Sequence, residues 1–140
     1  MQWNPYLNFN GDCQEAFRYY ERVLGGKIIM MMSHADMPAE AQGQTPPDWK
    51  NKIMHARLTV GDGDQVLMGS DSPPGHFEKT QGMYVALQID DPDKAERIFA
   101  ALADNGAVRM PIQQTFWAVR FGMLVDKFGI PWMVNCEKKN

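Results

Sequence analysis

The feature that most constrains this chain is a repeated order of predicted secondary structure. Two segments carry an apolar stripe at helical spacing, and each stripe marks one face of an amphipathic helix. The first stripe contains Ala16, Phe17, Tyr20, Val23 and Leu24, and the second contains Ala95, Ile98, Phe99 and Leu102. A strand-like segment precedes each helix and three follow it. The chain is therefore predicted to repeat a βαβββ unit, although few residues are identical between the halves.

Turn and cap residues set the expected boundaries of the two modules. Asp12 and the pair Asp91-Pro92 are typical of helix starts, and Gly25-Gly26 is typical of a helix end. Gly61-Asp62-Gly63 predicts a hairpin turn, and Pro73-Pro74-Gly75 predicts a linker. The predicted strands are 3–9, 27–33, 52–60, 64–70, 82–90, 108–115, 117–125 and 130–137. We expect an α+β fold in one domain, 1–140, with module one at 1–72, a linker at 73–81 and module two at 82–137.

Composition narrows the possible function classes. The formal net charge of −3 argues against a nucleic-acid partner, which requires clustered Lys and Arg. No apolar run approaches the roughly 18 residues of a membrane span, and the first residues lack a signal-peptide pattern. Two cysteines, Cys13 and Cys136, are too few for a disulfide framework. We expect a cytoplasmic protein with buried thiols and no membrane partner.

Three stretches carry a resemblance to a known family. They are PYLNFNGDCQEAFRYYERVLGG (5–26), IMHARLTVGDGDQVLMGSD (53–71) and QTFWAVRFGMLVDKFGIPWMVN (114–135). Together with the βαβββ order, they resemble the PhnB-like subgroup of the vicinal oxygen chelate superfamily, also called the glyoxalase/bleomycin resistance/dioxygenase superfamily. The resemblance implies that two modules curl into a half-open barrel around a cavity, and that two copies form a homodimer. Some relatives are labelled as ubiquinone-pathway methyltransferases, but this chain lacks a Gly-rich nucleotide loop after its first strand.

Side-chain alternation separates a packed face from a cavity face on each predicted strand. In 53–60 the apolar set is Met54, Ala56, Leu58 and Val60, and the opposite set is Ile53, His55, Arg57 and Thr59. In the first strand, Leu7 and Phe9 are predicted to pack in the core. The same parity assigns cavity positions to Asn4, Tyr6, Asn8, Met68, Ser70, Tyr84, Ala86, Gln88, Met133 and Asn135.

Metal-using members of the superfamily place four His and Glu ligands on the first and fourth strands of each module. The resemblance puts those positions at Asn4, Met68, Tyr84 and Asn135. Two amides, a thioether and a phenol offer no anionic ligand to a divalent ion at neutral pH. We therefore expect neither a metal site nor a cofactor.

The charged and aromatic candidates each have more than one interpretation. His55 either hydrogen-bonds within a polar cavity wall, or contacts a ligand, or acts as a base that Asp71 orients. Arg57 and Arg120 either bind an anion or pair with a nearby carboxylate. Trp117, Phe116, Phe121, Tyr6 and Tyr84 either stack on a planar ligand or fill the core, and Trp132 is predicted to be core.

Three further features are less informative about function. Met30-Met31-Met32 alternates between faces and predicts adaptable packing. His34-Ala35-Asp36 is a weak metal pair because no third ligand lies at suitable spacing. The long loop 35–51 either covers the cavity with Trp49 or uses Trp49 to contact a dimer partner.

These observations favour metal-independent binding of a small anionic or aromatic molecule. The predicted ligand-binding residues are Asn4, Tyr6, His55, Arg57, Met68, Tyr84, Trp117 and Asn135. One alternative is a superfamily enzyme, a lyase, isomerase or dioxygenase, with a lost or relocated metal site. Another is an antibiotic-sequestering resistance protein. Fold alone does not decide among these three.

Overall fold

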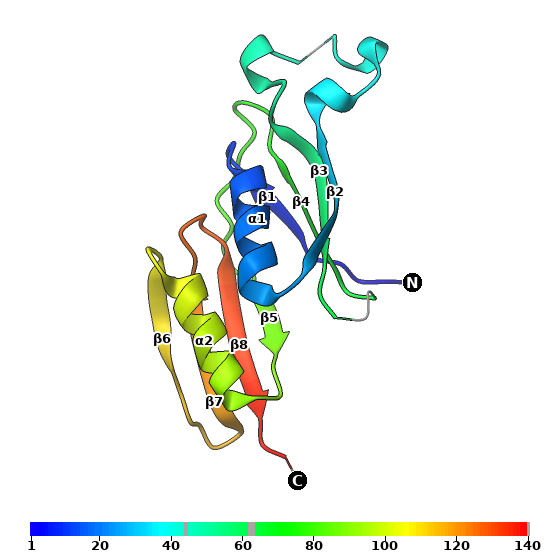
Figure 1. Ribbon diagram of the computed structural model, residues 1–140. Coiled ribbons are helices and arrows are strands. Elements are labelled where there is room, and N and C mark those ends of the chain that lie inside the picture. The colour runs from blue at the N-terminus through cyan, green and yellow to red at the C-terminus, as the bar shows by residue number, and fades with distance from the viewer. Residues whose placement is uncertain (44, 62–63, 140) are drawn as a thin grey trace. The chain divides into compact units, whose positions relative to one another are not determined.

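The structure, a computed structural model, describes residues 1–43, 45–61 and 64–139. It divides into two units, Met1–Glu78 and Lys79–Asn140, and the division falls within the predicted linker 73–81. Each unit contains one helix and one four-stranded sheet (Figure 1). No helix among the described residues is long and apolar enough to cross a membrane.

Unit 1 is a four-stranded mixed sheet with one helix on one face. Its elements are β1 (Tyr6–Phe9), α1 (Cys13–Leu24), β2 (Lys27–Ser33), β3 (Ile53–Thr59) and β4 (Val66–Asp71). The strand order is β1-β4-β3-β2, in which β1 and β4 are parallel and the other pairs are antiparallel. The loop between β2 and β3 contains three short 3₁₀ turns, His34–Asp36, Ala39–Ala41 and Pro47–Trp49. Two residues of the predicted turn Gly61-Asp62-Gly63, namely 62 and 63, lie outside the described residues.

Unit 2 repeats this topology. Its elements are β5 (Val85–Gln88), α2 (Pro92–Ala103), β6 (Ala107–Gln113), β7 (Ala118–Val125) and β8 (Pro131–Glu137). The strand order is β5-β8-β7-β6, and only β5 and β8 are parallel. The predicted α+β fold of two βαβββ modules is therefore confirmed, with most strands shorter than the sequence pattern suggested.

The helix-facing core follows the predicted stripes. In α1 the buried residues are Cys13, Ala16, Phe17, Tyr20 and Leu24, and in α2 they are Ala95, Ile98, Phe99 and Leu102. Leu7, Phe9, Ala56 and Leu58 are buried on the sheet of unit 1. Trp132 is fully buried in unit 2, as predicted. Burial of these apolar side chains is the main favourable term in each unit.

The start of α1 is capped from a distant strand. Asp12 occupies the N-cap position, but its side chain makes no cap hydrogen bond. Instead, Asp71 at the end of β4 accepts hydrogen bonds from the N–H groups of Gly11 and Cys13, both at 3.0 Å, and of Ile53 at 2.8 Å. The predicted Gly25 end is confirmed by its left-handed φ of 68°. Asp91 caps α2 as predicted, accepting from Asp93 N at 3.0 Å.

The predicted alternation in β3 is wrong at its first two residues. Ile53 is buried, whereas Met54 is half-exposed. The pairing explains this difference, because Met32 pairs with His55 and Ser33 pairs with Ile53, so that Met54 is left out of the ladder. An irregularity of this kind inserts one residue and reverses the alternation beyond it. From Ala56 to Thr59 the alternation is as predicted.

Candidate functional sites on the distal faces

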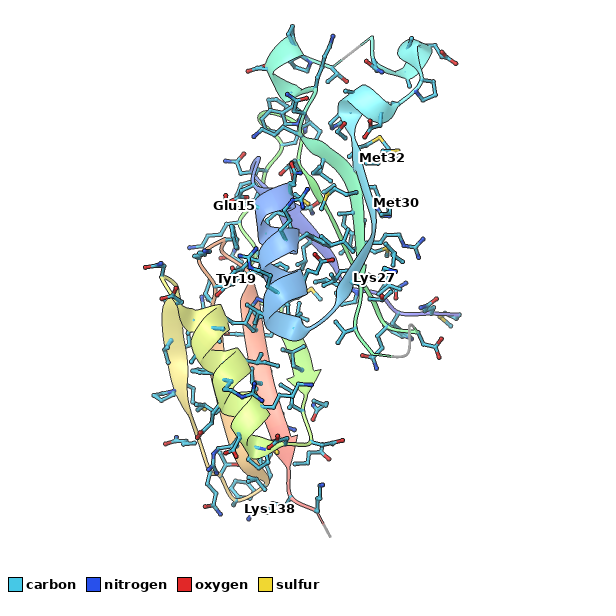
Figure 2. All side chains as sticks on the ribbon, viewed as in Figure 1. Glu15, Tyr19, Lys27, Met30, Met32 and Lys138 are labelled. Atoms are coloured by element: carbon cyan, nitrogen blue, oxygen red, sulfur yellow. The ribbon has the colours of Figure 1, made fainter. Side chains whose placement is uncertain are left out.

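Each sheet has a face turned away from its helix, which we call its distal face. In unit 1 a cross-strand row on this face joins Tyr6, Met68, Arg57 and Met30 through successive strand pairs. A second row contains Asn8 paired with Ser70, and His55 paired with Met32. Met30 and Met32 lie along β2 (Figure 2). Met31 pairs instead with the buried Ala56, so two of the three consecutive methionines share the distal face.

Tyr6 and His55 form a direct contact on this distal face. The Tyr6 hydroxyl lies 3.3 Å from His55 Nδ1, and the two rings are stacked with centroids 5.7 Å apart. The predicted orienting role of Asp71 is wrong, because both of its carboxylate oxygens accept backbone N–H groups. Tyr6, which sequence parity had placed on the same face, is the partner of His55 instead.

Arg57 brings a positive charge to this face. Its Nε atom is buried and has no hydrogen-bond partner. Arg120, by contrast, forms an ion pair with Glu96, with Nε and Oε1 2.9 Å apart. Buried polar groups are nearly always hydrogen-bonded, so an unpartnered guanidinium nitrogen requires an explanation. Among the described residues of unit 1, four further buried polar atoms lack a partner, namely Asn4 Oδ1, both ring nitrogens of His34, and Trp49 Nε1.

The distal face of unit 2 is neutral along its two central rows. One row joins Ala86, Met133, Met123 and Met110. The other joins Gln88, Asn135, Phe121 and Gln113. Both rows therefore cross all four strands of the sheet, with Met133 and Asn135 on β8 and Met123 and Phe121 on β7.

Asn135 is the central polar group of this face. It is 9% exposed, and its Nδ2 donates to Gln88 Oε1 at 2.8 Å, whereas its Oδ1 has no partner. Phe121 pairs with it across the strands and contacts Trp117 edge to face, with centroids 5.3 Å apart. Trp117 in turn contacts Phe116 at 4.9 Å. Trp117 is 46% exposed, so it is not a core aromatic.

Two residues near these sites were not singled out from the sequence. Arg109 on β6 donates from Nη1 to the Tyr84 hydroxyl at 2.7 Å and lies over the Tyr84 ring. Gln88 orients the Asn135 amide. Side-chain alternation had placed Gln88 on the correct face. Its contact with Asn135, however, depends on the parallel pairing of β5 with β8, which the local sequence does not reveal. Nothing in the sequence singled out Arg109.

Arg120 is not available for an anion site beside Arg57. Its pairing with Glu96 of α2 places it on the helix side of the sheet in unit 2, opposite Phe121. Its Nη1 also donates to its own neighbour's carbonyl, Val119 O, at 2.8 Å. Of the two interpretations of Arg120, anion binding or pairing with a carboxylate, the structure therefore supports pairing with a carboxylate.

Comparison with known proteins places the chain in a family. The family model described as 3-demethylubiquinone-9 3-methyltransferase matches residues 2–135, nearly the whole length. The chain belongs to this PhnB-like family. Protein YjdN of Escherichia coli (strain K12) is 37% identical over 147 aligned positions, covering 99% of this chain and 97% of YjdN. The family resemblance read from the sequence is thus confirmed.

Solved structures of PhnB-like and glyoxalase-like proteins share the fold. Protein PA1353 from Pseudomonas aeruginosa is 48% identical, with a TM-score of 0.88 and 99% of both chains covered. A PhnB protein from Bacillus cereus is 23% identical, with a TM-score of 0.78 over 97% of this chain and 99% of its own. A glyoxylase/bleomycin resistance protein/dioxygenase domain from Frankia sp. EAN1pec has 14% identity and a TM-score of 0.66, covering 96% and 95%. At 23% and 14% identity, the Bacillus cereus and Frankia structures show only that the fold is shared.

The donor set of this PhnB-like chain differs from a superfamily metal site. The described residues contain no group of three or more His, Cys, Asp or Glu placed to hold a metal ion. Asp36, a member of the weak metal pair, accepts hydrogen bonds from Ser33 N at 2.9 Å and Ser33 Oγ at 3.0 Å. These bonds, the backbone one above all, lower the pKa of Asp36.

Trp49, near the end of the long loop of the PhnB-like chain, contacts other residues of unit 1. Its ring lies beneath the Lys52 ammonium, 5.8 Å from the ring centroid, and close to Gly11. Lys52 also donates to Gly11 O at 2.8 Å, which ties the end of the loop to the turn after β1. Trp49 Nε1 is buried without a partner. These contacts place Trp49 in unit 1, and whether it also meets a ligand or a second copy stays a prediction.

Proposed function

We propose that this PhnB-like protein binds a small anionic molecule on the distal face of unit 1, without a metal ion. The observation that carries the proposal is the buried Nε of Arg57, a donor with no acceptor. A planar guanidinium presents several N–H groups in a geometry that matches carboxylate and phosphate oxygens. A bound anion would supply both the missing acceptor and the opposite charge.

The surrounding residues support an anion rather than a cation. The residues that share this face and its rows are Tyr6, Asn8, Met30, Met32, His55, Met68 and Ser70, and none carries a carboxylate. Tyr6 and His55 offer hydrogen-bonding groups beside the charge. An antibiotic-sequestering function that takes a cationic ligand fits this face poorly, because Arg57 would repel the ligand.

Of the ligand-binding residues predicted from the sequence, those that belong to the anion site lie in unit 1: Asn4, Tyr6, His55, Arg57 and Met68. The other three, Tyr84, Trp117 and Asn135, lie in unit 2 and take no part in the proposed anion site. The proposal also includes the homodimer and the cytoplasmic location that the family resemblance implies, and light scattering of the purified protein would measure the dimer. The family's description names a methyltransferase, but the proposal rests on the distal faces and takes no activity from that name.

The Tyr6–His55 contact favours one second candidate, an enzyme that moves a proton on the bound anion. An imidazole can accept and donate a proton, and the Tyr6 hydroxyl beside Nδ1 holds the His55 ring in place. Proton NMR in D₂O would show deuterium exchange at the carbon beside the ketone of a small oxoacid probe, such as the methyl group of pyruvate. Exchange that stops in His55→Ala supports this candidate, and exchange at the buffer rate excludes it for that probe.

The binding proposal can be tested with calorimetry and thermal shift. Inorganic phosphate, methylphosphonate and acetate are titrated into wild-type protein, Arg57→Ala and Arg57→Lys. Loss of a charge-assisted hydrogen bond, which costs about 2–3 kcal/mol, should weaken anion binding roughly 30- to 150-fold in Arg57→Ala. Arg57→Lys keeps the charge and should keep part of the affinity. Chelation before the titration should leave binding of the wild-type protein unchanged.

Arg120→Ala is the matched control for Arg57→Ala. It removes the same charge and side chain, but its partner is Glu96 on the helix side of unit 2. Binding of the three anions should therefore be the same in Arg120→Ala and in wild-type protein. Equal anion affinity in Arg57→Ala and wild-type protein would contradict the proposal.

A further inference from the structure

Asn135 on β8 presents a buried hydrogen-bond acceptor that the protein itself does not use. The residue is 9% exposed, and its Oδ1 is among the buried polar atoms without a partner. Leaving such a group unpaired is unfavourable, so an unused acceptor of this kind points to a donor from outside the chain. Its position on the distal face of unit 2 separates it from the helix-packed core.

The direction of this acceptor is set by a neighbouring strand. Asn135 Nδ2 donates to Gln88 Oε1 at 2.8 Å, and the two residues are paired in the parallel β5–β8 ladder. That bond uses one of the two N–H donors of the amide and fixes its orientation, and the carbonyl oxygen is left without a partner. Gln88 is therefore a positioning residue for Asn135.

Aromatic side chains lie beside the acceptor. Phe121 is the direct cross-strand partner of Asn135, and Trp117 and Phe116 continue a chain of edge-to-face contacts from it. Trp117 is 46% and Phe116 87% exposed, which leaves ring surface for stacking. The adjacent row of Met110, Met123 and Met133 adds flexible, polarizable side chains that adapt to a flat ligand.

The charges near this site favour a neutral ligand. The row of Asn135 contains only Gln88, Phe121 and Gln113 besides itself. Arg120 is on the helix side with Glu96, and Arg109, which keeps its charge, is hydrogen-bonded to the Tyr84 hydroxyl outside this row. No full charge thus stands beside Oδ1 on its own row to recruit an anion or a cation.

We infer that the distal face of unit 2 binds a neutral, planar ring that carries an N–H donor, such as a lactam or an imide. The N–H donates to Asn135 Oδ1, and the ring stacks against the Phe121–Trp117 cluster. This inference goes beyond the proposed function, because it concerns a different unit and a different ligand chemistry. It does not depend on Arg57.

The test uses two probes, one with the proposed donor and one in which a methyl group replaces its hydrogen. 2-Quinolone has a lactam N–H, and N-methyl-2-quinolone lacks it. Both are titrated into ¹⁵N-labelled protein, with the Trp117 indole and Asn135 amide signals as readouts. The N–H form should bind about tenfold or more tightly, because the N-methyl form leaves Oδ1 unpaired. Equal affinities, or no binding of 2-quinolone at its solubility limit, would overturn the inference.

Variants separate hydrogen bonding from stacking. Asn135→Leu should abolish the preference for the N–H form, and Gln88→Ala, at an exposed residue, should reduce it while leaving the fold intact. Trp117→Leu should weaken both probes by the same factor and leave the ratio unchanged. A preference that persists in both Asn135→Leu and Gln88→Ala would also overturn the inference.

The two proposals can fail separately. Arg57→Ala should leave the ratio for the two quinolones as it is in wild-type protein, and Asn135→Leu should leave phosphate affinity as it is in wild-type protein. Loss of phosphate binding without loss of the quinolone preference would refute the anion site alone. The reverse pattern would refute the inference about Asn135 alone.

Discussion

At the scale of single residues, several polar groups that seemed suited to chemistry have structural roles. Asp71 holds the start of α1 and the start of β3 through three backbone N–H groups. Cys13 is the first residue of α1 and is completely buried. Burial raises the pKa of the Cys13 thiol above its ordinary value, and the charges of Asp71 and Asp12 raise it further. The thiol therefore stays protonated and unreactive in the folded protein.

The raised pKa of Cys13 predicts a loss of stability in alkaline solution. Below about pH 8.5 the thiol is protonated in both states and has no effect on the pH dependence. Above that pH the unfolded chain loses the proton while the folded protein keeps it, so the unfolded state binds fewer protons. The free energy of unfolding should then fall by up to about 1.4 kcal/mol per pH unit from this group.

Urea denaturation of wild-type protein and Cys13→Ala from pH 7 to 10 checks this prediction. The variant should start less stable, because it removes a buried sulfur, and the difference should shrink as the pH rises above about 8.5. Parallel curves across this range would show that Cys13 ionises equally in both states.

At the scale of elements, each helix packs its phenylalanine against a strand glycine. A Cβ added at Gly69 in β4 would lie 2.7 Å from Phe17 Cε1 and 2.9 Å from Leu7 O. A Cβ added at Gly122 in β7 would lie 2.6 Å from Phe99 Cε2 and 2.9 Å from Ile112 Cα. In both units, then, the close approach of helix and sheet depends on the missing side chain.

Gly69→Ala and Gly122→Ala should each lower the free energy of unfolding by about 1–3 kcal/mol, the usual cost of overpacking. Gly43→Ala is the matched control, since a Cβ there meets no atom within 4 Å. Its effect should stay within about 0.5 kcal/mol. Denaturant unfolding of the three variants gives the comparison. A Gly69→Ala or Gly122→Ala variant as stable as Gly43→Ala would mean that the helix moves away at no cost.

At the scale of the whole molecule, the chain keeps the superfamily fold, with uncharged side chains at the four positions where the resemblance places metal ligands. The glyoxalase-like topology is present in both units. Of the four positions at which the resemblance places metal ligands, Tyr84 bonds Arg109 and Asn135 bonds Gln88. Met68 lies in the row of Tyr6 and Arg57, and a thioether beside a guanidinium is a poor ligand for a hard divalent ion.

This donor chemistry predicts that stability does not depend on a divalent metal. Melting temperatures of untagged protein with EDTA, and with added zinc, nickel or manganese, should agree within about 1 °C, because a ligand that does not bind the folded state adds no stability. Elemental analysis of the same sample should find far less than one equivalent of these metals or of iron. Near-stoichiometric metal, or a fall in melting temperature with EDTA, would contradict the prediction.

The sequence by itself determined the order of elements, the buried stripe of each helix and the face on which Tyr6, His55, Arg57 and Asn135 lie. These properties follow from local periodicity, because a helix repeats every 3.6 residues and a strand every two. The predicted packed face of 53–60 failed at two residues: at Met54, where pairing inserted an extra residue, and at Val60, which follows the end of β3 and is 38% exposed.

Only the tertiary structure decided which polar groups meet. Asp71 bonds the start of α1 rather than His55, Arg120 pairs with Glu96, and Tyr6 reaches His55 across β4. Those partners are set by strand order and by the approach of a helix from far along the chain, which leave no local trace. The same reason explains why Arg57 Nε and Asn135 Oδ1 are known to be unpartnered only from the folded chain. Whether a polar group lacks a hydrogen-bond partner depends on all of its neighbours, and only the folded structure determines those neighbours.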